Sequence, residues 1–218
     1  RLSSFSIAKY GPQTGSDWQW MPDAGNGVLS SGNITGNITG NDPNDANVPV
    51  DSTFQREWIT YLKGKYGSAS AGGLRYYLLD NEPGLWHETH RDIHPVGASM
   101  DELWTRLSTH AAAIKSADPG AMVVGPEEWG YLGLTFSGLD AQNGRWVGGP
   151  GSDRAAHGNL DCLPWLLQQF QQYQNANGVR LLDVCTTHCY PTGNEFSNDV
   201  SATTQALRNR STRALWDP

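Results

Sequence analysis

Short apolar, β-prone runs alternate along the chain with segments of helical periodicity, and this alternation restricts the fold more than any other feature. The runs cover residues 74–79, 121–125 and 179–185. The spacing of apolar residues predicts helices over residues 52–62, 100–116 and 160–175. Strands that alternate with helices through short connections are typical of a parallel α/β architecture. We therefore expect an α/β fold of parallel strands alternating with helices.

Capping and breaking residues support the helix boundaries. Asp51 and Ser52 are candidate N-caps of the first helix, and Gly64 and Gly67 are candidates for its end. The second helix stops at Asp118-Pro119-Gly120, and the third closes at Asn177-Gly178. Residues 1–50 and the Gly-rich stretch 138–158 are predicted to be long loops.

Each predicted strand ends in a polar cluster. The clusters are Asp80-Asn81-Glu82-Pro83, Pro126-Glu127-Glu128-Trp129 and Thr187-His188-Cys189-Tyr190-Pro191. In a barrel of βα units the active site gathers at the C-terminal ends of the strands, so these clusters are expected to meet there. An open nucleotide-binding sheet is disfavoured, because the sequence contains neither GxGxxG nor GxxxxGK[ST].

Composition excludes several classes of partner. The net charge is -7 with only 15 Lys and Arg residues, which argues against a nucleic-acid partner. No run of 18 apolar residues is present, so we expect no membrane span, and we see no signal peptide. The nine Trp residues suit stacking on sugar rings, although large aromatic residues also fill protein cores.

No metal site or cofactor is predicted. Three cysteines, Cys162, Cys185 and Cys189, do not make a disulfide framework, and we expect buried free thiols. The histidines at 87, 90 and 94, with Glu88 and Asp92, have spacings that could bind zinc on a helix, but Pro95 favours a loop rich in hydrogen-bond donors.

Glu82 is the strongest candidate for chemistry. It follows an apolar strand and stands between Asn81 and Pro83. A carboxyl group at a strand end that is partly enclosed by aromatic residues loses solvation, which favours its protonated form. This is the property that a general acid needs near neutral pH.

Several motifs resemble one known family. The stretch from Asp80 to Pro95 reads DNEPGLWHETHRDIHP, and it is followed by Gly125-Pro126, Trp129-Gly130-Tyr131, His188–Pro191 and Thr212–Pro218. In this order, over residues 50–218, the motifs resemble the endoglucanases and xyloglucanases of glycoside hydrolase family 44. The resemblance implies a (β/α)8 TIM barrel that cleaves β-1,4-glucans with retention of configuration, with Glu82 as its acid/base.

The resemblance also implies that the chain is incomplete. The family's nucleophile is a Glu in a Thr-Glu-Tyr-type motif on a later strand, beyond Pro218, and a complete barrel takes ~250 residues. We therefore expect residues 1–218 to be one incomplete barrel domain, with a loop region at 1–50 and consecutive βα units over 51–218. It should be inactive alone and should need the remainder of the catalytic module as a partner.

The predicted substrate is a β-glucan polysaccharide, so a secreted, extracellular enzyme is expected. The predicted substrate-binding residues are Asn81, Trp86, His90, Glu127, Trp129, His188 and Tyr190. Cys189 stands where the family more usually has an aromatic residue, which puts one stacking contact in doubt.

Two alternatives remain open. Glu127 or Glu128 could be a second carboxylate in an inverting pair, about 6.5–9.5 Å from Glu82, although one of them binding a sugar hydroxyl or supporting Glu82 is favoured. A non-catalytic carbohydrate-binding fragment is one rival function, and a barrel hydrolase acting on xylan or mannan is another. The first is disfavoured because such modules are usually β-sandwiches.

Overall fold

The computed structural model describes residues 48–90, 93–145, 148–189, 198–211 and 213, and the predicted loop over residues 1–47 therefore lies outside them. The chain divides into two compact units, residues 1–187 and 188–218. Within the described part of the first unit, β1 (Tyr76–Leu78), β2 (Met122–Glu128) and β3 (Val184–Thr187) form a parallel sheet in the order β1-β2-β3. This confirms the expected α/β class with parallel strands.

Two long helices precede and follow β1. The first, α2 (Ser52–Tyr66), starts at Asp51, whose Oδ1 accepts hydrogen bonds from the Thr53 and Phe54 amides at 2.9 and 3.1 Å. It runs past Gly64 and ends at Gly67, whose φ of 88° suits glycine. The second, α4 (Met100–Ala117), starts at Ser99 and ends at Asp118, as predicted from the following Pro119-Gly120. Between them lie η2 (Ala69–Ala71), η3 (Pro83–Leu85) and α3 (Trp86–Thr89).

The segment between β2 and β3 is more helical than predicted. It contains α5 (Gly130–Thr135), α6 (Gly138–Gln142), α7 (Asp153–Ala156) and α8 (Cys162–Asn177), which ends at Gly178 as expected. The expectation of a loop over 138–158 was wrong for α6 and α7. Asp140 explains why, since its buried carboxyl group accepts hydrogen bonds from the Asp153 and Arg154 amides at 2.8 and 3.0 Å and so fixes the start of α7.

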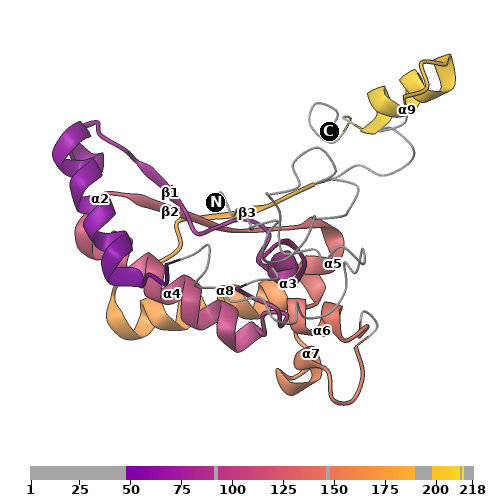
Figure 1. Ribbon diagram of the computed structural model, residues 1–218, viewed down its shortest axis with the longest axis horizontal. Coiled ribbons are helices and arrows are strands. Elements are labelled where there is room, and N and C mark those ends of the chain that lie inside the picture. Colours follow the sequence, from indigo (N-terminus) through magenta and orange to yellow (C-terminus); the bar gives the residue numbers. More distant parts are fainter. Residues whose placement is uncertain (1–47, 91–92, 146–147, 190–197, 212, 214–218) are drawn as a thin grey trace, which may run out of the picture. The chain divides into compact units, whose positions relative to one another are not determined.

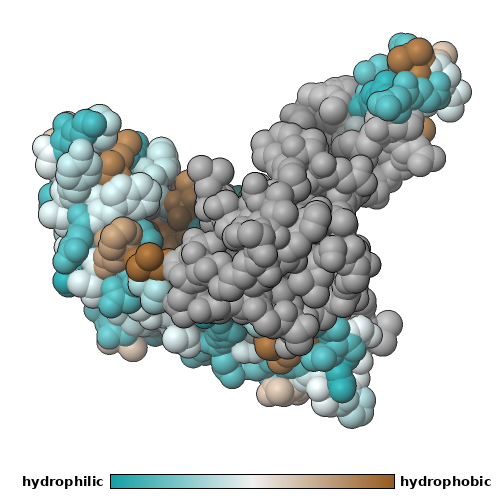
Figure 2. Space-filling view, viewed as in Figure 1, coloured by the Kyte–Doolittle hydropathy of each residue, from teal (hydrophilic) through white to brown (hydrophobic). Residues whose placement is uncertain are grey.

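The core lies between the sheet and the helices, which cover one face of the strands (Figure 1). Its fully buried members come from α4, α8 and the strands and their flanks, and include Met100, Leu103, Val123, Leu166 and Leu181. Alternation along β1 sends Tyr77 and Leu79 toward the helices, whereas Tyr76 and Leu78 are 55% and 60% exposed among the described residues. In Figure 2, hydrophobic residues (brown) lie among hydrophilic residues (teal) on the left of the view, where Figure 1 labels α2.

An ion pair joins the start of β2 to α4 and the approach to β3. Asp183 Oδ2 accepts hydrogen bonds from the Val123 amide at 2.7 Å and from Lys115 Nζ at 2.6 Å. Lys115 also donates to the Ala121 carbonyl oxygen at 2.8 Å. These contacts lie at the N-terminal end of β2, opposite the polar clusters, and in barrel folds that end is associated with stability rather than chemistry.

The second unit contains α9 (Ala202–Ser211). Asp199 precedes it and accepts hydrogen bonds from the hydroxyl groups of Ser201 and Thr204, both at 2.5 Å. These bonds lower the pKa of Asp199 to about 2. Across the described residues of both units, no helix is long and apolar enough to cross a membrane.

The expectation that the cysteines are buried was wrong for two of them. All three thiols are free, but only Cys162 is buried, whereas Cys185 and Cys189 are exposed. Cys162 begins α8 and belongs to the hydrophobic core, where burial raises the pKa of its thiol.

Candidate active site

Glu82 lies in the turn that leaves the C-terminal end of β1. Its backbone is left-handed, with φ of 47° and ψ of 57°, and its side chain is half-buried. Its amide donates to the Glu127 carbonyl oxygen at 2.9 Å, and its own carbonyl oxygen accepts from the Leu85 amide at 2.9 Å. A non-glycine residue persists in such a conformation only where its surroundings hold it, and such residues cluster at functional sites.

The end of β2 has an unusual backbone as well. Pro126 pairs with Thr186 and Glu128 pairs with Thr187, so Glu127 is an extra residue in a bulge, with φ of 56°. A bulge re-aims side chains and is common beside active sites. It separates the two glutamates, because Glu127 is half-buried whereas Glu128 is only 3% exposed.

Glu128 is engaged with the Glu82 turn. Its Oε1 accepts hydrogen bonds from the Gly84 amide at 3.2 Å and from the Trp129 amide at 3.0 Å. The carboxyl group is thus used inside the protein, which leaves Glu127 as the member of the pair with solvent access. Sequence reasoning listed Glu127 for substrate binding, but it did not predict which of the two glutamates would contact the Glu82 turn, because the bulge has no signal of its own in Pro-Glu-Glu-Trp.

Trp86 follows the turn and packs inward. It is 7% exposed, its ring contacts the His94 ring edge-on at 5.3 Å between centroids, and the Arg106 guanidinium lies 5.9 Å above it. His94 Nε2 and Arg106 Nε both contact Glu102 Oε1, at 2.8 and 2.6 Å. Partial burial opposes ionisation of Glu102, but these two partners outweigh it and lower the pKa of the Glu102 carboxyl group.

The histidine-rich segment after Glu82 is partly helical, where a loop was predicted. Residues Trp86–Thr89 form α3, and His90 caps it, with Nδ1 at 2.9 Å from the Thr89 hydroxyl. His87 is buried and lies 3.6 Å from the Glu88 carboxylate. Among the described residues, no group of three His, Cys, Asp or Glu side chains is arranged to hold a metal ion.

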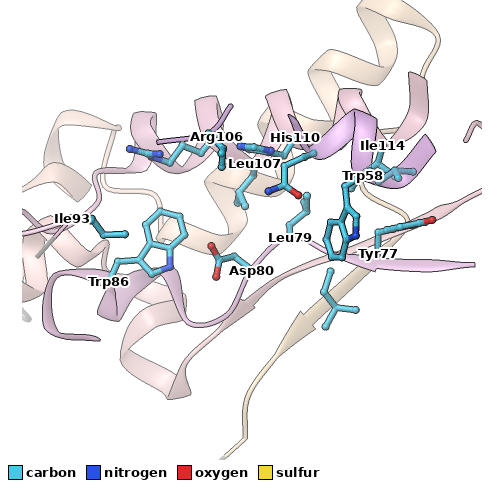
Figure 3. A pocket seen from close by; sticks show the side chains of 14 residues that line it. Trp58, Tyr77, Leu79, Asp80, Trp86, Ile93, Arg106, Leu107, His110 and Ile114 are labelled. Carbon is cyan, nitrogen blue, oxygen red and sulfur yellow. The ribbon is translucent and has the colours of Figure 1, made fainter. Parts of the chain in front are cut away.

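A cavity of about 450 Å³ opens between α2, β1 and α4 (Figure 3). Trp58 and Trp86 line it from opposite ends of the view, and the Asp80 carboxyl group lies between Trp86 and Leu79. His110 also lines it, and burial together with the Arg106 charge lowers the pKa of His110. Asp80 and Trp86 line this cavity whereas Glu82 and Glu127 do not, so it is beside the candidate acid and does not surround it.

The predicted site residues fall into three groups. The strand ends bring Asn81, Glu82, Glu127 and Trp129 to one end of the sheet. Trp86 begins the short helix that follows, and His90 caps its C-terminus. His188 is half-buried and belongs to the second unit, one residue past the end of β3. Tyr190 lies outside the described residues.

Comparison with known proteins decides the family. The model of glycoside hydrolase family 44 matches residues 1–193. The chain belongs to this family. The match begins at the first residue, so it also covers the stretch of 1–50 over which no motif of the family was recognised from the sequence.

Solved family 44 structures agree with the described fold. The chain is similar to CelM2, a bifunctional glucanase-xylanase from a metagenome library, with 58% identity and a TM-score of 0.85 over 100% of this chain and 41% of that chain. A Paenibacillus polymyxa xyloglucanase of family 44, solved with xyloglucan, is 33% identical with a TM-score of 0.62, over 75% of this chain and 31% of its own.

Two curated relatives are much longer than the matched region. Beta-mannanase/endoglucanase A of Caldicellulosiruptor saccharolyticus is 37% identical over 174 residues, which are 76% of this chain and 12% of that protein. Endoglucanase A of Paenibacillus lautus is 35% identical over 183 residues, 80% of this chain and 24% of that protein. The family 44 chain described here thus spans a quarter or less of these relatives.

Proposed function

We propose that this chain is part of a retaining endo-β-1,4-glucan hydrolase of the cellulase or xyloglucanase type, in which Glu82 is the acid/base. The observation that carries the proposal is the Glu82 turn, half-buried at a strand end and tied by its backbone to the end of the neighbouring strand. Membership of family 44 supports the class of reaction.

In this mechanism Glu82 protonates the glycosidic oxygen as the bond breaks and later removes a proton from the attacking water. A second carboxylate attacks the anomeric carbon and forms the covalent glycosyl-enzyme, and the two carboxyl groups stand about 5–5.5 Å apart. We assign this nucleophile to residues outside 1–218. The partial (β/α)8 barrel of 1–218 would be completed by the remainder of the module, and secretion to the extracellular space would bring the enzyme to its polysaccharide.

The other predicted residues would bind the sugar chain. Asn81 is exposed beside Glu82, and Glu127 is half-buried on the bulge, so both can offer polar groups to sugar hydroxyls. Trp129 precedes α5 and is partly exposed, which suits stacking. Trp86 has little exposed surface left, so its contribution would come mainly from supporting the groove.

The decisive test is Glu82→Gln in the full-length enzyme that contains this chain. General acid–base catalysis contributes roughly 100- to 10,000-fold, so hydrolysis of xyloglucan and carboxymethylcellulose should fall at least ~100-fold. Glu88→Gln is the matched control, because Glu88 lies on the following helix with a side chain that is 62% exposed. A near-normal rate for Glu82→Gln would discard the assignment.

The retaining outcome has its own test. Proton NMR of the first product formed should show the β-anomer before mutarotation, whereas the α-anomer would indicate an inverting pair and would redirect attention to Glu127.

A second activity is favoured by the relatives. CelM2 is described as a glucanase-xylanase, and the Caldicellulosiruptor protein as a mannanase/endoglucanase. We therefore propose that xylan or mannan is a secondary substrate. Initial rates on purified xyloglucan, barley β-glucan, xylan and mannan would decide it, and activity on β-glucans alone would reject it.

A further inference from the structure

We propose that Glu128 is a positioning residue, whose buried carboxyl group fixes the backbone turn that presents Glu82. The inference rests on the proposed function of Glu82 as the acid/base. Glu128 is the last residue of β2 and only 3% exposed. A carboxyl group is rarely buried so deeply unless its oxygens accept hydrogen bonds, so its partners indicate its role.

The Glu128 carboxyl group joins two segments that are far apart in the sequence. Its Oε1 accepts from the Gly84 amide, 44 residues earlier, at 3.2 Å, and from the adjacent Trp129 amide at 3.0 Å. The first bond crosses from β2 to the turn after β1. The second holds the carboxyl group at the start of α5.

The space around this carboxyl group is built for it. A Cβ atom at Gly84 would lie 2.7 Å from Glu128 Oε1 and 3.0 Å from Trp129 Nε1. A Cβ atom at Gly133, on α5, would also lie 2.7 Å from Glu128 Oε1. The backbone therefore approaches the carboxyl group closely at two glycines, one before Glu128 in the chain and one after it. This leaves the Oε1 atom little freedom to move.

The candidate acid is fixed on both sides by consecutive residues of β2. The Glu82 amide donates to the Glu127 carbonyl oxygen, and two residues later the Gly84 amide donates to Glu128. Between these bonds Glu82 holds φ of 47°, which is costly for a residue with a side chain. Releasing the Gly84 bond would let the turn relax and would move the Glu82 side chain.

The chemistry predicts a specific defect. A general acid misplaced by about 1 Å can lose ~100-fold in rate. The loss should depend on the leaving group, since phenol needs a proton to depart whereas 2,4-dinitrophenol departs without one. A variant that merely weakens the fold would affect both leaving groups equally.

The principal variant is Glu128→Asp in the full-length enzyme. It keeps the carboxyl group but withdraws the oxygen by about 1.5 Å, one C–C bond, from the Gly84 amide. With aryl β-cello-oligosaccharides, we expect kcat/KM to fall ~100-fold for the phenyl substrate and less than about fivefold for the 2,4-dinitrophenyl substrate. Glu128→Gln retains an oxygen at the accepting position, so it should stay within about tenfold of the wild-type value with both leaving groups.

Asp183→Asn is the matched structural control. Asp183 is also a largely buried carboxylate that accepts a β2 amide, but at the opposite end of the strand. It should lower the melting temperature while leaving kcat/KM unchanged for both substrates below that temperature.

The outcomes separate the two proposals. If Glu82→Gln shows the leaving-group-dependent loss and Glu128→Asp does not, the positioning role is wrong while the acid/base assignment stands. If Glu128→Asp loses equal activity on both substrates, its role is structural and the inference is overturned. If Glu82→Gln itself keeps normal activity on the phenyl substrate, the proposed function fails first.

Discussion

The ion pair between Lys115 and Asp183 gives a stability prediction that can be worked from the structure. Asp183 Oδ2 accepts from Lys115 Nζ at 2.6 Å and from the Val123 amide at 2.7 Å, and the two side chains are only 14% and 16% exposed. We expect Asp183→Asn to lower the free energy of unfolding by about 2–3 kcal/mol.

The magnitude follows from what each partner keeps. Removing one member of a buried pair costs about 3–5 kcal/mol, because the other charge is left without compensation. Here Lys115 keeps its bond to the Ala121 carbonyl oxygen, and asparagine keeps an oxygen for the Val123 amide. The residual exposure also admits some water, so we expect a loss below that range, about 2–3 kcal/mol.

A double-mutant cycle measures the pair directly. Asp183→Asn, Lys115→Met and the double variant would be compared by equilibrium urea unfolding of the full-length enzyme, with Lys65→Met as an exposed-lysine control expected within about 0.5 kcal/mol of wild type. The double variant should be about 1–2 kcal/mol more stable than the sum of the single effects predicts. Effects that add to within about 0.5 kcal/mol would refute the reasoning.

Two further predictions concern titration and reactivity. Burial disfavours the charged form of His157, but hydrogen bonds to the Asp153 carbonyl oxygen and to Asp101 outweigh it and raise the pKa of His157. The stabilisation of the fold by His157 is therefore complete below its unfolded pKa of about 6.5 and is lost as the pH rises through its native pKa. In urea unfolding, His157→Gln should therefore destabilise the protein more at about pH 5.5 than at about pH 9. Equal effects at the two pH values would contradict this. Cys162 is 3% exposed, and burial raises the pKa of its thiol, so the thiol should not react with Ellman's reagent in the native protein. Cys162→Ser should therefore leave the number of reactive thiols unchanged in the native protein. After unfolding, it should lower that number by one. A lower count in the native variant would show that Cys162 is accessible.

The helix boundaries were readable from the sequence because local chemistry determines them. Asp51 caps α2 through its own side chain, and Gly178 ends α8 with φ of 69°. Both effects act within a few residues, so a sequence pattern can reveal them. The predicted strand boundaries were less accurate, since β3 begins at Val184, whereas the sequence predicted a start at Val179.

The short helices escaped prediction because distant contacts specify them. The start of α7 is fixed by Asp140, thirteen residues before Asp153, and no apolar period marks a helix of this length. Glycine content over 138–158 suggested a loop, and tertiary hydrogen bonds overrode that tendency. Similarly, the sequence suggested a buried thiol for Cys185 because it ends an apolar, β-prone run. In the structure this residue is exposed.

The candidate site, like the helices, was predictable from the sequence only in part. The sequence predicted a chemical role for Glu82, which stays a prediction, and placed it after a strand, because polar residues after an apolar run indicate a strand end. The structure has Glu82 in the turn after β1. It placed Glu127 among the substrate-binding residues, but it did not predict that Glu128 would contact the Gly84 amide. The bulge makes the difference, and it depends on pairing with β3, which no local pattern encodes.

The geometry of the turn therefore depends on all three strands rather than on β1 alone. Pairing with β3 produces the bulge, the bulge directs Glu128 inward, and Glu128 and the Glu127 carbonyl oxygen hold the Glu82 turn. The first step is backbone pairing between neighbouring parallel strands, and the last combines a backbone bond with a side-chain bond to the turn. Contacts of this kind allow the loops at strand ends to hold functional groups precisely. A change that shifts the register of β2 against β3 should displace the candidate acid even though it touches no residue of the Glu82 turn.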